Sequence, residues 1–442
     1  MACLSRFHLT ALLRTAALAL LLAGCAGTPP RSLVTPLPLP SAAKPPVTPT
    51  PDARRVPMRG VWLTTVSRLD WPPVTSVTAA PAERVRLQQA SLIAKLDQLK
   101  QLGINTVFFQ VKPDGTALWS SKILPWSDTL TGHIGEYPGY DPLAFLLKEA
   151  HQRGIKVHAW FNPYRVSTNV KPGTLRELQR TLAQQPASVY VLHPDWIRTA
   201  SDRLVLDPGI PAARDWITSI MAEVVSHYAV DGVQFDDYFY TETAASPLND
   251  SATFRQYGAG FTSKADWRRN NTLQLIEQVS RTIKKVRPGV AFGVSPAGVW
   301  RNLSHDPAGS DTRGAAAYDE AYADTRLWVQ RGLLDYIAPQ LYWPFARAAA
   351  RYDVLTRWWA DVVRPTPVQL YIGVALYKVG VASKMEPDWT RQNGVPELQK
   401  QIELNESLPD VDGTILFREG YLSQPQTQEA VRYLQDRWKS RD

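Results

Sequence analysis

Residues 91–115 read SLIAKLDQLKQLGINTVFFQVKPDG, a helix-like segment followed at once by a strand-like one. In the first part, leucines recur at spacings of three and four from Leu92 to Leu102, so they share one face of a helix that Gly103 ends. The second part, Asn105 to Val111, is an apolar, β-branched and aromatic run of strand length. The stretch therefore predicts an amphipathic helix that packs on a buried strand.

The same unit recurs along the chain, where strand-like runs alternate with helix-like ones. The predicted strands are 60–66, 105–111, 156–161, 232–235, 291–295, 336–340, 369–374 and 413–417. The predicted helices are 82–102, 142–153, 211–228, 271–286, 316–331, 348–361, 394–405 and 426–438. This alternation predicts an α/β fold, a (β/α)₈ TIM barrel with extended βα loops over residues 58–442. A doubly wound open sheet is the alternative, but the glycine fingerprint that binds phosphate after its first strand is absent.

The N-terminal 24 residues predict a lipoprotein signal peptide. Arg6 and Arg14 precede an apolar run that is too short to span a bilayer. Leu22-Ala23-Gly24-Cys25 resembles the lipobox of bacterial lipoproteins, which implies lipidation of Cys25; an ordinary secretory signal with a chance cysteine is the alternative. Residues 25–57, the lipidated cysteine and a Pro-rich stretch, predict a tether. We expect a lipid-anchored protein of the cell envelope, on the outer membrane and facing the periplasm.

Composition excludes several classes of function. Both cysteines, Cys3 and Cys25, lie in the signal region, so the processed protein would lack a thiol for disulfides or catalysis. The net charge is +8, or +6 without Arg6 and Arg14, and no Lys/Arg cluster or nucleic-acid motif accompanies it. The seven histidines have no zinc-binding spacing. We therefore expect no nucleic-acid partner, no metal and no cofactor.

Two adjacent carboxylates, Asp236 and Asp237, follow the predicted strand 232–235. In a (β/α)₈ barrel the carboxyl ends of the strands carry the catalytic groups. Adjacent carboxylates repel each other, so at least one should have a raised pKa, as a general acid requires. We predict that Asp236 and Asp237 are catalytic. The alternative is that one of them caps a helix or pairs with Arg165 or Lys112.

Polar and aromatic side chains also follow other predicted strands, a mixture typical of sugar recognition. The predicted substrate-binding residues are Trp62, Gln110, Asp114, His158, Trp160, Asn162, Arg165, Tyr238, Tyr240, Ser295, Gln340, Tyr342 and Trp343. For each aromatic residue, packing in the core or at the rim is an equal alternative, and for His158 a hydrogen-bonded core histidine is the commoner outcome.

Several blocks of the sequence resemble the glycosyl-hydrolase-like family 10 domain of exported bacterial proteins. These blocks are 59–64 (RGVWLT), 109–115 (FQVKPDG), 125–128 (PWSD), 158–165 (HAWFNPYR), 206–209 (LDPG), 231–240 (DGVQFDDYFY), 295–302 (SPAGVWRN) and 339–343 (PQLYW). The resemblance implies a (β/α)₈ barrel, a lipoprotein or exported location and, as in members found at the division site, cleavage of peptidoglycan glycan strands that have lost their stem peptides. The family commonly has Arg where this chain has Lys112.

The aspartate pair also looks like the neighbouring carboxylates of hexosaminidases, which implies substrate-assisted, retaining hydrolysis. By that resemblance Asp236 would orient the acetamide of an N-acetylated sugar and Asp237 would protonate the leaving oxygen. Tyr238, Tyr342 and Asn162 would position the acetamide and the hydroxyls. The expected partners are peptidoglycan or a related polysaccharide, the membrane through the N-terminal lipid, and division-site proteins.

Two alternatives stay open at this stage. Residues 231–236 (DGVQFD) are also similar to the strand-four segment of the α-amylase clan, which would make Asp236 a covalent nucleophile. That clan expects a glutamic acid at the next strand end, where this chain has Ser295. The second alternative is a glycan-binding outer-membrane lipoprotein without hydrolytic activity, which would tolerate the loss of Asp237.

Overall fold

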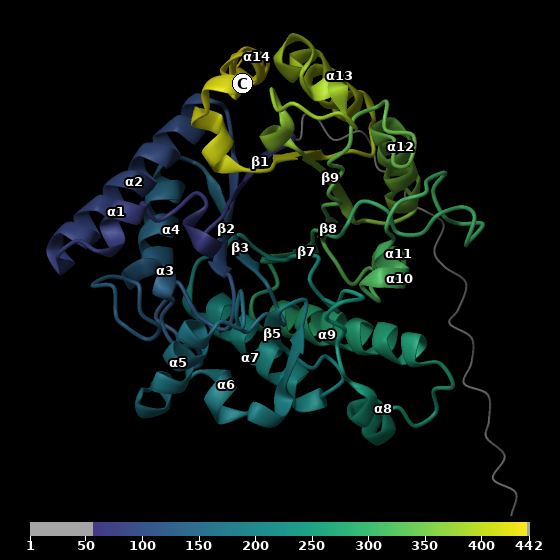
Figure 1. Ribbon diagram of the computed structural model, residues 1–442. Helices are drawn as coiled ribbons and strands as arrows, with labels where there is room; N and C mark the ends of the chain where they lie inside the picture. The colour runs from purple at the N-terminus through teal and green to yellow at the C-terminus, as the bar shows by residue number, and fades with distance from the viewer. Residues whose placement is uncertain (1–55, 440–442) are drawn as a thin grey trace, which may run out of the picture. The chain divides into compact units, whose positions relative to one another are not determined.

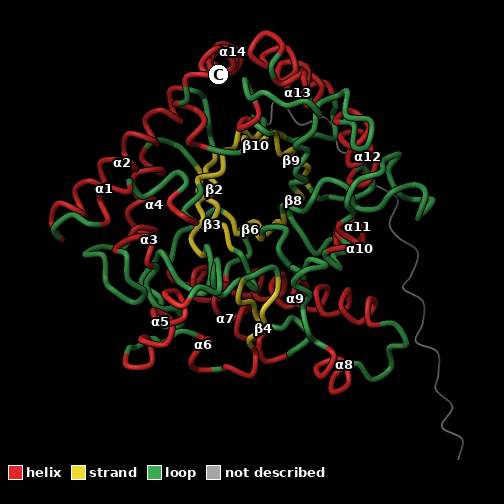
Figure 2. The backbone as a smooth tube through the Cα atoms, viewed as in Figure 1, coloured by secondary structure: helices red, strands yellow, loops and turns green. Residues whose placement is uncertain are grey.

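The computed structural model describes residues 56–439, and these form a closed barrel of parallel strands surrounded by helices (Figures 1 and 2). The strands are β1 (Met58–Leu63), β2 (Thr106–Lys112), β3 (Lys156–Phe161), β6 (Gly232–Phe235), β7 (Ala291–Val294), β8 (Tyr336–Ile337), β9 (Gln369–Val374) and β10 (Gly413–Leu416). Around the barrel their order is β1-β10-β9-β8-β7-β6-β3-β2, which closes because β1 pairs with both β10 and β2. The predicted (β/α)₈ barrel is confirmed. The predicted signal peptide, Cys25 and the tether up to residue 55 lie outside the described residues.

Helices cover the outside of the barrel, which appears as a ring of strands in Figure 2. The main ones are α2 (Pro81–Gln101), α4 (Pro142–Gln152), α7 (Pro211–His227), α9 (Lys264–Val286), α11 (Thr325–Gln330), α12 (Tyr352–Val363), α13 (Val395–Ser407) and α14 (Gln428–Lys439). In α2 the buried face includes Leu92, Leu96 and Leu99, as the spacing predicts. Gly103 ends the helix with a φ of 77°, a conformation that glycine adopts without strain.

Alternate residues of each strand fill the inside of the barrel, and those between them pack against the helices. On β6, Val233 and Phe235 belong to the outer core, whereas Gly232 faces the inward-pointing His158. A Cβ on Gly232 would lie 2.4 Å from Nδ1 of His158, so only glycine leaves room for that ring. Large aromatic side chains, including those of Phe108 and Tyr336, form a second buried cluster inside the barrel.

Several predicted elements differ from the structure at their ends: the helix predicted over 271–286 already begins at Lys264, and the strand predicted over 60–66 is Met58–Leu63. Two further differences have a clear physical reason. The helix predicted over 316–331 is two helices, α10 (Ala317–Glu320) and α11, separated by Tyr322 at a φ of 51°. Asp324 then begins α11 by accepting a hydrogen bond from Leu327 N. The strand predicted over 336–340 is shorter, because Pro339 has no N–H to continue the ladder.

Long βα loops carry further elements on the carboxyl-terminal side of the barrel. They include α3 (Asp128–Thr131), α5 (Pro172–Arg180), α6 (Val189–Leu192), α8 (Ser251–Tyr257) and an antiparallel hairpin of β4 (Ile197–Ala200) and β5 (Arg203–Leu206). The predicted barrel with extended loops therefore describes the fold, although the sequence did not indicate the hairpin.

The two ends of the described chain meet at the opposite, amino-terminal side of the barrel. The guanidinium of Arg59, at the start of β1, donates to the carbonyl oxygen of Trp438 in α14 at 2.9 Å and to that of Gly103 at 3.4 Å. Within residues 56–439, no helix has the length and apolar character that a membrane span requires.

Candidate active site

A cavity of about 180 Å³ opens at the carboxyl ends of the barrel strands. Predicted site residues that line it are Trp62, Gln110, Trp160, Asn162, Arg165, Asp236, Asp237, Tyr238, Ser295, Gln340 and Tyr342. Thr64, Val66, Leu69 and Phe417 also line it, and none of these four is among the predicted site residues. Residues from strands far apart in the sequence thus converge on one site, as the barrel requires.

Asp236 is the best-anchored carboxylate of the cavity. Its position continues the inward-facing alternation of β6, so the side chain points into the mouth. Oδ2 accepts a hydrogen bond from Trp160 Nε1 at 3.1 Å, and Oδ1 accepts one from the backbone N–H of Asp237 at 2.9 Å. The Asn162 amide, oriented with its nitrogen toward Asp236, donates to Oδ2 at 3.1 Å. These donors fix the orientation of the carboxylate.

Asp237 lies beside this group and is partly exposed. Burial of its carboxyl in the cavity wall, together with the charge of Asp236, raises the pKa of Asp237 well above its usual range, although Arg165 acts in the opposite direction. A raised pKa favours the protonated form of the carboxyl, which can donate a proton, whereas the hydrogen-bond donors around Asp236 hold that neighbour as an acceptor. The two aspartates therefore have different environments at one strand end.

A chain of side-chain amides links Asp236 to the end of β1. Gln110 Oε1 accepts hydrogen bonds from Thr65 N at 3.0 Å and Val66 N at 2.8 Å. Its Nε2 donates to the Asn162 side-chain oxygen at 3.0 Å, which leaves the Asn162 nitrogen for Asp236. The ends of β1, β2, β3 and β6 are therefore joined by hydrogen bonds, and a shift of one strand would move the carboxylate.

Lys112 supports this site from below, a role that the sequence analysis did not predict. It is buried, and its Nζ donates to the carbonyl oxygens of Asn162, Pro163 and Arg165 at 2.8, 3.2 and 3.3 Å. Burial lowers the pKa of Lys112 to about 7. A lysine at the end of an otherwise apolar strand was the available signal. Neither Lys112 nor Arg165 lies within 4.0 Å of an acidic group in the described residues.

Aromatic groups form the walls of the cavity. The charge of Asp236 and then burial raise the pKa of Tyr238 to about 12. Burial raises the pKa of Tyr342, whose ring packs edge-on against Tyr377 at 5.8 Å and beside Phe417 at 5.5 Å. Both hydroxyls therefore keep their protons at neutral pH and can donate hydrogen bonds to a ligand.

Gln340 and Ser295 close the side of the cavity formed by β7 and β8. Gln340 Nε2 donates to the carbonyl oxygen of Ser295 at 3.0 Å and contacts its Oγ at 3.3 Å. A longer contact of 3.5 Å reaches Oδ1 of Asp236. These residues orient each other next to the aspartate pair.

The structure places four predicted binding residues outside this cavity. His158 is only 4% exposed and lies deeper in the barrel, with Nδ1 3.0 Å from the hydroxyl of Tyr336; burial lowers the pKa of His158 to about 4. Asp114 lines an adjoining cavity of about 260 Å³. Tyr240 is buried, and its hydroxyl accepts from Asn271 at 3.0 Å. Trp343 packs beside Gly298. For His158 and Tyr240 the structure therefore agrees with the alternative stated above, that these residues pack in the core.

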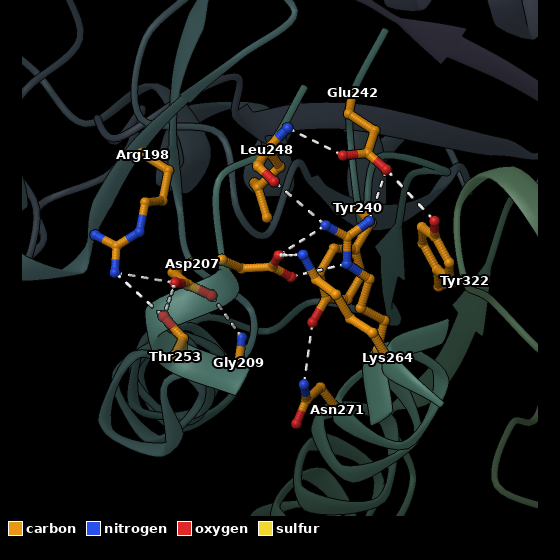
Figure 3. A network of polar contacts seen from close by, with 12 residues as sticks. Arg198, Asp207, Gly209, Tyr240, Glu242, Leu248, Thr253, Lys264, Asn271 and Tyr322 are labelled. Carbon is orange, nitrogen blue, oxygen red and sulfur yellow. Dashed lines mark hydrogen bonds and ion pairs between the residues drawn. The ribbon is translucent and has the colours of Figure 1, made fainter. Parts of the chain in front are cut away.

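The loop that follows Asp237 is held by a network of ion pairs (Figure 3). Arg268 of α9 donates to both oxygens of Asp250 at 2.7 and 2.8 Å and to Glu242 at 2.6 Å. Its guanidinium lies beside two rings, with Cζ 5.0 Å from the ring centroid of Tyr240 and 4.8 Å from that of Tyr322. Asp207 at the end of β5 belongs to the same region and pairs with Arg198 at 3.1 Å. The network fixes the far end of the segment that begins with the aspartate pair.

The described residues contain no group of three or more His, Cys, Asp or Glu side chains arranged to hold a metal ion. The groups that line the cavity are carboxyl, amide, hydroxyl, aromatic and guanidinium groups.

Comparison with known proteins agrees with this geometry. The family model described as glycosyl hydrolase-like 10 matches residues 57–391. The chain is 71% identical over 425 residues to the glycosyl hydrolase DigH of Escherichia coli K12, covering 96% of both chains. It is 43% identical over 363 residues to the glycosyl hydrolase YngK of Bacillus subtilis, covering 81% of this chain and 68% of that one.

Solved structures share the fold at low sequence identity. The endo-1,4-beta-mannanase of Rhizomucor miehei has a TM-score of 0.51 at 11% identity, with 88% of this chain and 97% of that chain covered. Alpha-L-fucosidase isoenzyme 2 of Paenibacillus thiaminolyticus has a TM-score of 0.52 at 13% identity, with 87% of this chain covered but only 50% of that longer one. The chain therefore belongs to the glycosyl hydrolase-like 10 family and is a glycoside hydrolase.

Proposed function

We propose that this glycoside hydrolase cleaves N-acetylated glycan strands of the cell envelope, namely peptidoglycan strands without stem peptides, with the substrate acetamide as nucleophile. One observation carries the mechanism: among the described residues that line the cavity, the acidic ones are Asp236 and Asp237, both at the end of β6. Retaining and inverting enzymes with two carboxylates place them on opposite sides of the scissile bond. A nucleophile supplied by the substrate removes the need for that second position.

In the proposed first step, the acetamide oxygen attacks the anomeric carbon while the bond from that carbon to the leaving oxygen breaks. Asp237 gives its proton to the leaving oxygen. The acetamide N–H donates to Asp236, which balances the positive charge of the cyclic oxazolinium intermediate. Water then attacks the anomeric carbon, its proton returns to Asp237, and the acetamide is restored. Two displacements at the same carbon retain its configuration.

The environments of the two aspartates support these different roles. Asp237 has a raised pKa, as a proton donor needs, and Asp236 is oriented by Trp160 and Asn162. Trp62, Trp160 and Tyr342 offer ring surfaces for the C–H faces of a sugar, and Gln340 offers an amide for its hydroxyls.

The substrate and location in this proposal rest on the sequence. Resemblance to family members found at the division site favours peptide-free peptidoglycan. The signal-like N-terminus, with its lipobox at Leu22-Ala23-Gly24-Cys25, favours an enzyme anchored to the outer membrane through Cys25 and facing the periplasm. Division-site proteins are the proposed protein partners.

Mass spectrometry of soluble products tests the proposal on three substrates. These are peptide-free strands, intact peptidoglycan, and peptide-free strands whose acetamides have been converted to amines. We expect short N-acetylated products from the first substrate, fewer from the second and none from the third. Equal cleavage of the third would contradict the role of the acetamide, and a sugar covalently attached to Asp236 would support the nucleophile alternative.

Matched variants complete the experiment. Asp237→Asn removes the proton donor, whereas Asp361→Asn changes a carboxylate of α12 that is 66% exposed and lies on the outer helix layer. We expect product formation to be lost in the first variant and retained in the second.

A further inference from the structure

The guanidinium of Arg165 lines the cavity and is held in one position. Its Cζ lies 4.4 Å from the ring centroid of Tyr238, a stacking geometry that favours a cation. Nη1 donates to the carbonyl oxygen of Pro113 and to the Asn162 side-chain oxygen, both at 3.3 Å. Lys112 holds the backbone oxygen of Arg165 at 3.3 Å. The side chain is therefore preorganised before any ligand arrives.

The rest of this guanidinium has no protein partner in residues 56–439. Nε and Nη2 donate to no protein atom there, and neither is enclosed. No carboxylate lies within 4.0 Å, although Arg165 is only 8% exposed. Arg268 is similarly buried and is paired with Asp250 and Glu242, as is usual for a buried arginine. Arg165 thus presents to the cavity two donors and a positive charge that has no carboxylate within ion-pair distance in residues 56–439.

The geometry points to a specificity role that rests on the proposed function: Arg165 binds a carboxylate carried by the sugar substrate. A guanidinium edge with two free N–H groups matches the two oxygens of a carboxylate. Without such a cation, the aspartate pair would repel an anionic sugar.

This assignment gives a chemical reason for selecting strands without stem peptides. In peptidoglycan the lactyl group of muramic acid ends in an amide where a stem peptide is attached and in a free carboxylate where the peptide has been removed. Arg165 gains a charged partner only in the second case. Arg165 therefore distinguishes the two kinds of strand by the negative charge that removal of the stem peptide exposes.

The test compares two substrates that differ only in that charge: peptide-free strands, and the same strands with the lactyl carboxylates coupled to methylamine. We expect the wild-type kcat/KM to be higher on the free acid by about tenfold or more, since charge-assisted hydrogen bonds are the stronger kind. In Arg165→Gln this ratio should fall to about one, and in Arg165→Lys it should be intermediate. Any effect of Arg165 on the pKa of Asp237 acts on both substrates and cancels in the ratio.

A matched control is Arg281→Gln, which changes an arginine of α9 that is 70% exposed. Its ratio should equal that of the wild type. Thermal melts of both glutamine variants establish that they are folded, and Arg165→Lys provides the result if Arg165→Gln does not fold. A wild-type ratio of one, or an unchanged ratio in the Arg165 variants, would overturn the assignment.

A binding experiment separates this inference from the proposed function. Calorimetry with Asp237→Asn measures the affinity for N-acetylmuramic acid and for its methylamide, without any cleavage. If the enzyme cuts no peptidoglycan but binds the acid more tightly through Arg165, the proposed substrate is wrong and the carboxylate site stands. Equal affinities for acid and amide would refute the carboxylate site itself.

Discussion

The indole Nε1 of Trp160 donates to Oδ2 of Asp236 at 3.1 Å. This bond joins the ends of β3 and β6, so the tryptophan both forms a wall of the cavity and orients the carboxylate. A bond to a charged acceptor contributes about 1.5–3 kcal/mol, which makes its removal measurable.

Replacing Trp160 by Phe should lower kcat by about 10- to 100-fold, because the ring remains but the donor to Asp236 is lost. Trp119→Phe is the matched control, since Trp119 Nε1 donates to Glu223 at 2.9 Å outside the cavity. That change should lower the melting temperature and leave kcat unchanged. Steady-state kinetics and thermal melts of the two variants test whether Trp160 orients Asp236. Equal losses of kcat in both variants would argue against this role.

Asp237→Asn should lower kcat by about 10²- to 10⁴-fold, the contribution typical of a general acid, while binding of glycan strands is retained. The asparagine has a similar size but cannot transfer a proton. Product release is followed by mass spectrometry and binding by a pull-down of insoluble strands. Turnover at the wild-type rate would exclude Asp237 as the acid.

The raised pKa of Asp237 predicts a pH dependence in activity. The proton donor is present below the pKa of the folded enzyme, so kcat should decline as the pH rises through it. Arg165 lowers this pKa, so Arg165→Gln should move the decline to higher pH. A pH profile of kcat for both proteins provides the measurement, and a shift to lower pH would contradict the assignment.

The same group predicts a pH dependence in stability. A carboxyl whose pKa is higher in the folded than in the unfolded state takes up a proton on folding. The contribution of Asp237 to the free energy of unfolding is therefore present at low pH. It is lost as the pH rises from the pKa of this carboxyl in the unfolded state to its pKa in the folded state. Asp237→Asn stays neutral, so above that range it should melt at a higher temperature than the wild type. Thermal melts of the wild type and Asp237→Asn across pH measure this difference, with Asp361→Asn as the control. The gain in melting temperature would be absent if folding did not raise the pKa of Asp237.

Removal of Arg268 should destabilise the protein by about 3–5 kcal/mol, because the change leaves Glu242 without an ion-pair partner and the buried Asp250 with Lys264 alone. The variant Arg268→Met keeps much of the apolar contact with Tyr240 and Tyr322 and removes the charge. Arg281→Met on the exposed face of the same helix should change the free energy of unfolding by less than about 0.5 kcal/mol. Urea unfolding of both variants measures the difference.

The barrel could be predicted from the sequence because its strands are buried on both sides and read as short apolar runs. The bounds of β3, β6 and β9 match the prediction residue for residue. The break at Tyr322 could not be predicted, since no Gly or Pro marks it. There the chain bends to place the tyrosine ring beside Arg268 and its hydroxyl 3.4 Å from Glu242, a contact between distant parts of the chain.

The candidate site could be predicted in part, because barrel residues at strand ends meet at one face. Depth along the barrel axis could not be read from the pattern: His158 and Trp160 share the inward side of β3, yet only Trp160 reaches the cavity. Phe417 and Thr64 were missed because an aromatic or small polar residue at a strand end has no distinctive chemistry. The roles assigned to Asp236 and Asp237 stay predictions that the variants above examine.

The bond from Arg59 to Trp438 brings both ends of the described chain to the side of the barrel that faces away from the cavity. Either end is therefore a suitable site for attaching another group. A fluorescent reporter, a resin linker or a lipid attached there leaves the mouth unobstructed. If many copies were attached to one surface by that side, all their cavities would face away from the surface. They could then reach an insoluble polymer that is too large to diffuse to them.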